Sequence, residues 1–124
     1  MKKKIQSFED LEVYQKLTRL HLEVHEVTLS FPKFEMYELG SQLRRSSNSI
    51  PANLAEGRNN NHINLYLEGI NRALEELQET RHHLYVAFQK GYLDQLKYED
   101  VVARYAESAK MLFGLQHSLQ KFKP

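Results

Sequence analysis

The stretch that decides the fold is residues 63–88, INLYLEGINRALEELQETRHHLYVAF. Large apolar residues recur in it every three or four positions, which places them on one face of an α-helix. These residues are Ile63, Leu67, Ile70, Leu74, Leu77, Leu84 and Phe88. Gly91 follows, and glycine often adopts the left-handed backbone that ends a helix. The sequence therefore predicts one long amphipathic helix over 61–90.

Two similar stripes precede this helix. The first follows Ser7, a typical N-cap residue with acids after it, and stops at Pro32, so it predicts a helix over 8–30. The second predicts a helix over 34–56, which Gly57 would end. Each helix presents one apolar face, so each must pack against others to bury it.

A fourth stripe follows, with Asp94 as the expected N-cap of a helix over 95–122. Four amphipathic helices joined by short connections favour antiparallel neighbours. The sequence thus predicts an all-α fold, a single domain over 1–124 that forms an antiparallel up-down-up-down four-helix bundle. Only three prolines and five glycines occur, which argues against a turn-rich all-β domain.

Composition narrows the functional classes. The chain has 17 basic and 16 acidic residues, so its net charge does not indicate a partner. It has no cysteine, which excludes disulfides, thiolate nucleophiles and cysteine-bound metals. No apolar run approaches the roughly 20 residues needed to cross a bilayer, and no apolar segment follows the basic start as in a secretory signal. We therefore expect a cytoplasmic protein without membrane contact.

A row of polar residues lies beside the apolar stripe of the second predicted helix, at steps of three and four positions. The row is Gln42, Arg45, Ser49, Asn53 and Glu56. It could be a solvated face, a catalytic row, or a buried or interfacial hydrogen-bond network. We favour the network, because amides, a hydroxyl and an Arg/Glu pair can satisfy one another.

Pro51 lies inside the same predicted helix. It cannot donate the backbone hydrogen bond to the carbonyl of Ser47, and its ring crowds the preceding turn, so we expect a proline-kinked second helix. The alternative is a break, with Pro51 starting a separate short helix. The polar side chains of 46–49 can bond the backbone groups that either arrangement frees.

Arg81 falls within the apolar stripe of the third predicted helix. An unpaired guanidinium in a core would be costly, so we expect a carboxylate partner. Glu56 and Glu79 are the candidates. We interpret Arg81 as one half of a structural salt bridge that joins the polar network.

The segment 37–57, YELGSQLRRSSNSIPANLAEG, resembles the signature of the 23S rRNA-intervening sequence protein family, also called the four helix bundle protein family. That signature runs approximately Gln-Leu/Ile-x-Arg-Ala and then Ser-Ile-Pro-x-Asn-Ile/Leu-Ala-Glu-Gly. Similarity extends to 8–14, to Phe31-Pro32 and to 79–93, nearly the whole chain. The sequence departs from the pattern at 46–48, Ser-Ser-Asn in place of small apolar residues, and at Glu76. We expect the details of packing to differ from the pattern at these positions.

The resemblance implies a four-helix bundle that assembles into a homopentamer. Relatives include the accessory subunit of diversity-generating retroelements, which partners a reverse transcriptase and RNA. No enzyme activity or cofactor is attached to the family, and most members have no known function. The resemblance therefore implies a non-enzymatic oligomer.

Basic residues could supply a binding surface. In an up-down-up-down bundle the chain start, the second connection and the chain end share one pole, and one further arginine could extend the patch along the second helix. The candidates are Lys2, Lys3, Lys4, Arg44, Arg58, Lys121 and Lys123. They could gather phosphates of RNA or serve as solubilising tails. No RNA-recognition, zinc-finger or helix-turn-helix motif accompanies them.

Metal chemistry has weak support. The single Glu-x-x-His, Glu79 to His82, is half of what a di-iron bundle needs. His21 and His25 have a spacing that can bind zinc, but Glu23 is out of place for a zincin. We therefore expect no cofactor. The leading hypothesis is an oligomer that binds RNA or a nucleic-acid enzyme; a protein adaptor without nucleic acid is the alternative, and a metal-dependent enzyme ranks third.

Overall fold

The computed structural model describes residues 5–59 and 62–123, and within these ranges it contains helices and no strand. A short 3-10 helix, η1, precedes five α-helices. The elements are η1 Phe8–Asp10, α1 Glu12–Thr28, α2 Lys33–Met36, α3 Leu39–Arg58, α4 Ile63–Gln89 and α5 Gln95–Gln120. The predicted all-α fold with four long helices is confirmed.

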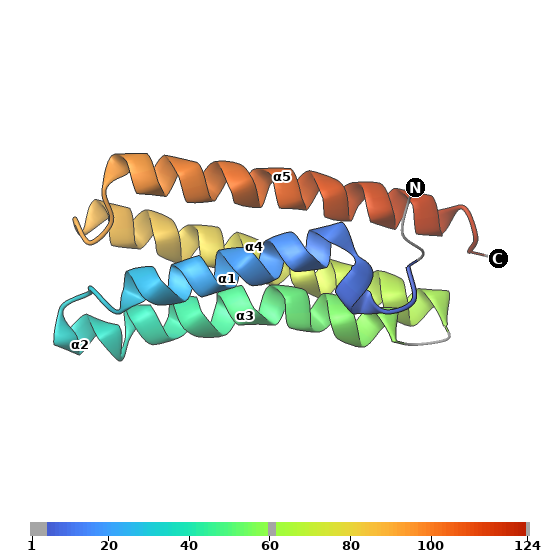
Figure 1. The fold of residues 1–124 in the computed structure, drawn as a ribbon, viewed down its shortest axis with the longest axis horizontal. Helices are drawn as coiled ribbons and strands as arrows, with labels where there is room; N and C mark the ends of the chain where they lie inside the picture. Colours follow the sequence, from blue (N-terminus) through green and yellow to red (C-terminus); the bar gives the residue numbers. More distant parts are fainter. Residues whose placement is uncertain (1–4, 60–61, 124) are drawn as a thin grey trace.

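The four long helices lie lengthwise beside one another (Figure 1). α1 and α4 run in one direction along the bundle, and α3 and α5 run in the other. Each packs against two neighbours, in the order α1, α3, α4, α5 and back to α1. η1, the C-terminal end of α3 and the C-terminal end of α5 lie at one end, and α2 lies at the other.

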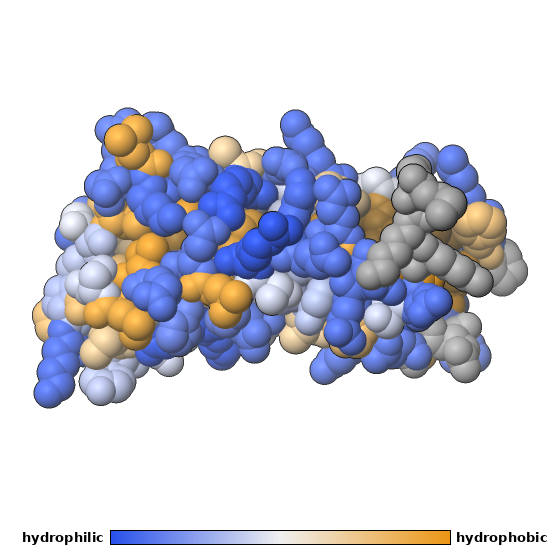
Figure 2. Space-filling model, viewed as in Figure 1, coloured by the Kyte–Doolittle hydropathy of each residue, from blue (hydrophilic) through white to orange (hydrophobic). Residues whose placement is uncertain are grey.

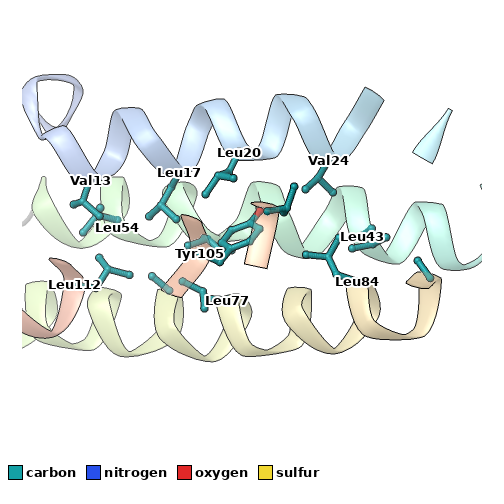
Figure 3. Close-up of a cluster of buried hydrophobic side chains, with 14 of the residues drawn as sticks. Val13, Leu17, Leu20, Val24, Leu43, Leu54, Leu77, Leu84, Tyr105 and Leu112 are labelled. Carbon is teal, nitrogen blue, oxygen red and sulfur yellow. The ribbon is translucent and has the colours of Figure 1, made fainter. Parts of the chain in front are cut away.

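The core is a column of mostly aliphatic side chains (Figure 3). Tyr105 of α5 is fully buried at its centre. The other residues with large, fully buried side chains are Leu17, Leu20, Val24, Leu43, Ile50, Leu54, Ile70, Leu77, Leu84, Val101 and Leu112. Burying such a side chain stabilises the fold by about 2 kcal/mol relative to leaving it exposed.

The first predicted helix is interrupted at Leu11. The Asp10 carboxylate accepts hydrogen bonds from the backbone N–H groups of Gln6 at 2.9 Å and Ser7 at 3.2 Å, and these bonds close η1 as a separate turn. Leu11 is then extended, with ψ of 124°, and its side chain is buried. The expectation of one helix over 8–30 was therefore wrong at its start, because Leu11 leaves the helix to reach the core.

The second predicted helix is also divided, into α2 and α3. The Arg44 guanidinium donates to the carbonyl of Met36 at 2.8 Å, which satisfies a group at the end of α2. The bend at 37–38 directs Glu35 into the protein, where its carboxylate pairs with Lys90 at 2.6 Å and accepts from the Tyr92 hydroxyl at 3.1 Å. The break thus gives Glu35 its partners across the end of the bundle.

The turn between α4 and α5 follows the sequence closely. Gly91 has φ of +79°, its N–H donates to the carbonyl of Phe88 at 3.0 Å, and the N–H of Tyr92 donates to that of Ala87 at 2.9 Å. These bonds form a Schellman motif, which ends α4. Asp94 caps α5 by accepting from the N–H of Lys97 at 2.8 Å, as predicted.

Pro51 lies inside α3, which continues through it to Arg58. The alternative of a separate helix starting at Pro51 is therefore wrong, and a kink at Pro51 stays a prediction. Gly57 is also inside α3, not after it. Its backbone faces Gly69 of α4, so that a Cβ on Gly69 would lie 2.9 Å from the Cα of Gly57. Gly57 is needed for this approach and not to end the helix.

Candidate nucleic-acid interface

The described cations of the predicted basic pole lie at one end of the bundle. Arg58 is in the last turn of α3, and Lys121 and Lys123 follow the last turn of α5, at the end where both helices terminate (Figure 1). The Arg58 guanidinium lies 5.9 Å from the centre of the Tyr66 ring, a cation–π distance, whereas both lysines are exposed. Lys2, Lys3 and Lys4 lie outside the described residues.

Acidic residues at the same end offset these three cations. Glu9 and Glu56 are exposed, and Asp10 is half-buried in η1. The carboxylate of Asp10 already accepts two backbone N–H groups, so part of its charge is neutralised within the fold. Any positive excess at this end therefore depends on the lysines that precede Ile5 in the sequence.

Arg44 does not extend a basic surface. Its guanidinium is half-buried and donates to the Thr28 hydroxyl at 2.7 Å as well as to the carbonyl of Met36. It thereby joins the end of α1, the end of α2 and the side of α3. The placement of Arg44 on an outer binding face was wrong, because its long side chain reaches back over the neighbouring helix ends.

The predicted polar row of α3 divides into a solvated part and a packed part. Gln42, Arg45 and Glu56 are exposed, while Ser49 and Asn53 are half-buried. The Asn53 side chain donates to the Ser49 carbonyl at 2.9 Å within the helix. The row therefore does not form one buried network.

Arg45 joins the row to α4. Its guanidinium lies 2.8 Å from a carboxylate oxygen of Glu79 and 3.8 Å from one of Glu76. Burial, followed by the effect of the neighbouring Glu79 carboxylate, raises the pKa of Glu76 above its usual value. Arg45 thus serves as a cation shared between two close carboxylates, which is a structural arrangement on the α3–α4 seam.

Arg81 lacks the expected partner. Glu79 pairs with Arg45 instead, and Arg81 makes no ion pair with any residue in the described ranges. It is half-buried and lines a groove between α4 and α5. The expectation of a structural salt bridge to Glu56 or Glu79 was wrong, because Arg81 lies on the α5 side of α4 whereas Glu79 lies on the α3 side.

Two buried hydroxyl contacts were missed by the sequence analysis. Ser46 of α3 lies 2.8 Å from the Thr80 hydroxyl of α4, and Ser47 lies 2.8 Å from Nδ1 of His21 on α1. Both serines are fully buried. The signal was present in the sequence, since these serines stand where the family pattern has apolar residues and so needed partners.

The histidine pairs do not gather metal ligands. His21 is engaged with Ser47, and Glu79 with Arg45. Among residues 5–59 and 62–123, no group of three or more His, Asp or Glu side chains is placed to hold a metal ion. In the same ranges, no helix combines the length and the apolar character required to span a bilayer.

Comparisons with known proteins give the family. A family model described as 23S rRNA-intervening sequence protein matches residues 9–114. A solved structure from Bacteroides thetaiotaomicron VPI-5482, a protein with unknown function from the S23 ribosomal protein family, is 22% identical with a TM-score of 0.77. The similarity covers 85% of this chain and 95% of that one, and at this identity it shows the fold alone. No curated protein matches the sequence. Since the family model spans most of the chain, the chain belongs to the 23S rRNA-intervening sequence protein family.

Proposed function

We propose that this protein is a non-enzymatic homo-oligomer, a pentamer, that binds RNA through the end of the bundle where α3 and α5 terminate. One observation carries the proposal: Arg58 is in the last turn of α3, and Lys121 and Lys123 follow α5, at the end of the bundle that carries η1. The sequence adds Lys2, Lys3 and Lys4 just before η1. Assembly around an axis along the bundle would bring these ends together. A basic face would result.

Charge of this kind attracts phosphates irrespective of base sequence. Each phosphate that a lysine or arginine neutralises releases counterions, so the affinity falls as salt rises. If about three cations per protomer each neutralise one phosphate of single-stranded RNA, log affinity falls against log salt with a slope of about −2. A purely apolar contact would lack this dependence.

The test measures fluorescence anisotropy of a labelled single-stranded RNA at several salt concentrations. Lys121→Glu with Lys123→Glu should abolish binding at low salt, because the pole then carries net negative charge. Lys33→Glu with Lys110→Glu is the matched control, since both lysines are exposed, Lys33 is in α2 at the opposite end and Lys110 is midway along α5. The control should bind like the wild type.

Two outcomes would overturn RNA binding. One is no affinity of the wild type for RNA at low salt, and the other is equal weakening by the two double variants. An affinity that does not change with salt would also contradict an electrostatic contact. Light scattering that gives a single protomer of 14.6 kDa would overturn the assembly.

The alternative is a protein adaptor without nucleic-acid contact. It is favoured by the groove between α4 and α5, where Phe113 is 55% exposed beside half-buried apolar side chains. Such a surface suits a protein partner. Copurification without nucleic acid, read from the absorbance ratio and nuclease sensitivity, together with a partner of fixed stoichiometry in a pull-down, would support the adaptor.

A further inference from the structure

Two grooves lie on adjacent sides of the bundle and share α5. The first, between α4 and α5, has a volume of about 550 Å³ and is lined by Leu74, Leu77, Ala109 and Phe113 among others. Arg81 reaches into it and makes no ion pair within the described part of the chain. Glu75, exposed, also lines this groove and forms no ion pair with a described residue, so the groove is a mainly apolar surface with one unpaired cation and one carboxylate.

The second groove lies between α1 and α5 and has a volume of about 480 Å³. Leu22, 58% exposed, and Val27 supply its apolar part, and Figure 2 shows apolar side chains at the surface over this part of α1. Glu23 and Lys97 pair with each other at 3.2 Å. Glu26, exposed, forms no ion pair with a described residue, so the charge left over in this groove is negative.

We propose that the two grooves are the two halves of one interface between copies of this chain. The α1–α5 groove of one copy packs against the α4–α5 groove of the next, and Glu26 of one pairs with Arg81 of the other. Leu22 then lies against the apolar wall near Leu77. The proposal rests on the assembly proposed above and names the surface that makes it.

The positions along the bundle agree with this pairing. Glu26 is in the last turn of α1, and Arg81 is in the last third of α4. Both helices run toward the end that carries α2 (Figure 1). Rotation about an axis parallel to the bundle keeps each residue at its height, so the two charges of neighbouring copies both lie in the half of the bundle that carries α2.

The placement of the grooves also favours a closed ring. They use different surfaces of the molecule, so the contact is head-to-tail, and such contacts close only if the rotation between copies divides a full turn. Adjacent sides of a four-helix bundle face directions roughly 90° apart, which corresponds to rings of about four or five copies. Grooves on opposite sides would instead give a filament.

Charge reversal tests the pairing directly. Glu26→Arg and Arg81→Glu should each prevent assembly at concentrations where the wild type is a ring, because each places like charges face to face in a desolvated contact. The dissociation constant should rise about 30-fold or more. The double variant restores opposite charges and should restore the ring, as read by native mass spectrometry and light scattering.

Controls separate this inference from the proposed assembly. Lys110→Glu, an exposed charge reversal elsewhere on α5, should leave the ring intact, and circular dichroism of every variant should show a folded bundle. Phe113→Asp, at an exposed groove position, should dissociate the ring without unfolding it. A monomeric wild type overturns the assembly itself. A wild-type ring that survives both single reversals, or that the double variant fails to restore, overturns only this interface.

Discussion

The α3–α4 and α1–α5 contacts both join amphipathic helices, but the first pair packs closely and the second leaves a cavity. In α3–α4 the backbones touch: a Cβ built on Gly69 would lie 2.7 Å from the carbonyl oxygen of Asn53. In α1–α5, a cavity of about 190 Å³ lies among Leu20, Ser108 and charged side chains. Small residues allow one pair to close, whereas long charged residues hold the other pair apart.

Buried hydroxyls follow the same division. The buried hydroxyls of Ser46 and Thr80 satisfy each other across α3–α4. On α5, the hydroxyls of Tyr105 and Ser108 are buried and have no hydrogen-bond partner in the described ranges. Burial also raises the pKa of Tyr105. The α3–α4 pair is thus joined by close backbone packing, whereas the α1–α5 pair is joined by ion pairs at the edge of its contact.

The largest effect on stability should come from adding a side-chain atom to Gly69 of α4, where the backbone of α3 lies close. Gly69→Ala would force a Cβ against backbone atoms of Asn53 and Gly57, which cannot move like side-chain tips. We expect a loss of about 3 kcal/mol in the free energy of unfolding, measured by urea titration. Gly114→Ala is the control: it is in α5 with nothing within 4 Å of its Cβ, and should stabilise by up to about 1 kcal/mol.

An intermediate effect should separate satisfied from unsatisfied hydroxyls. Thr80→Val keeps the side-chain shape but leaves the buried Ser46 hydroxyl without its partner, so we expect a loss of about 1.5 kcal/mol. Tyr105→Phe removes a buried hydroxyl that has no described partner and should change stability by less than about 0.5 kcal/mol. Equal losses in the two variants would show that the two contacts do not differ as described.

The smallest effect should come from the charges at the rim of α1–α5. Hydrogen bonding to Arg104, followed by that to Lys97, lowers the pKa of Glu23 from 4.5 to about 2. A carboxylate with a depressed folded-state pKa stabilises the fold above its unfolded pKa, and this stabilisation is lost as pH falls through the folded pKa. Because these side chains are 36% exposed, solvent screening leaves about 1 kcal/mol.

Glu23→Gln should therefore cost this amount above pH 5 and progressively less as the pH falls from 5 to 2, as read from urea titrations at each pH. High salt should reduce the difference at neutral pH, since the pairs are partly exposed. A cost that stayed constant between pH 5 and pH 2 would show that Glu23 acts through packing and not through its charge.

The long helices were readable in the sequence because periodic leucines and isoleucines can be buried only on one helical face. Gly91 and Asp94 were equally readable, since their roles are local to one turn. The split of the first two helices was not, because Leu11 leaves the helix to join the core and Glu35 turns toward Lys90, 55 residues away. The predicted positions of Arg44 and Arg81 were wrong for the same reason. The partners of a long side chain depend on which groups the packed helices bring within its reach.

The sequence by itself determined that this protein is an all-α chain of the 23S rRNA-intervening sequence protein family, with apolar stripes that must face inward. Those properties follow from residue spacing along one helix. Only the tertiary structure decided that Gly57 lies against Gly69, that Ser46 meets Thr80, and that Arg81 faces a groove. These contacts depend on the rotation and height of one helix against another, which the energy of the whole packed core sets and no local stretch encodes.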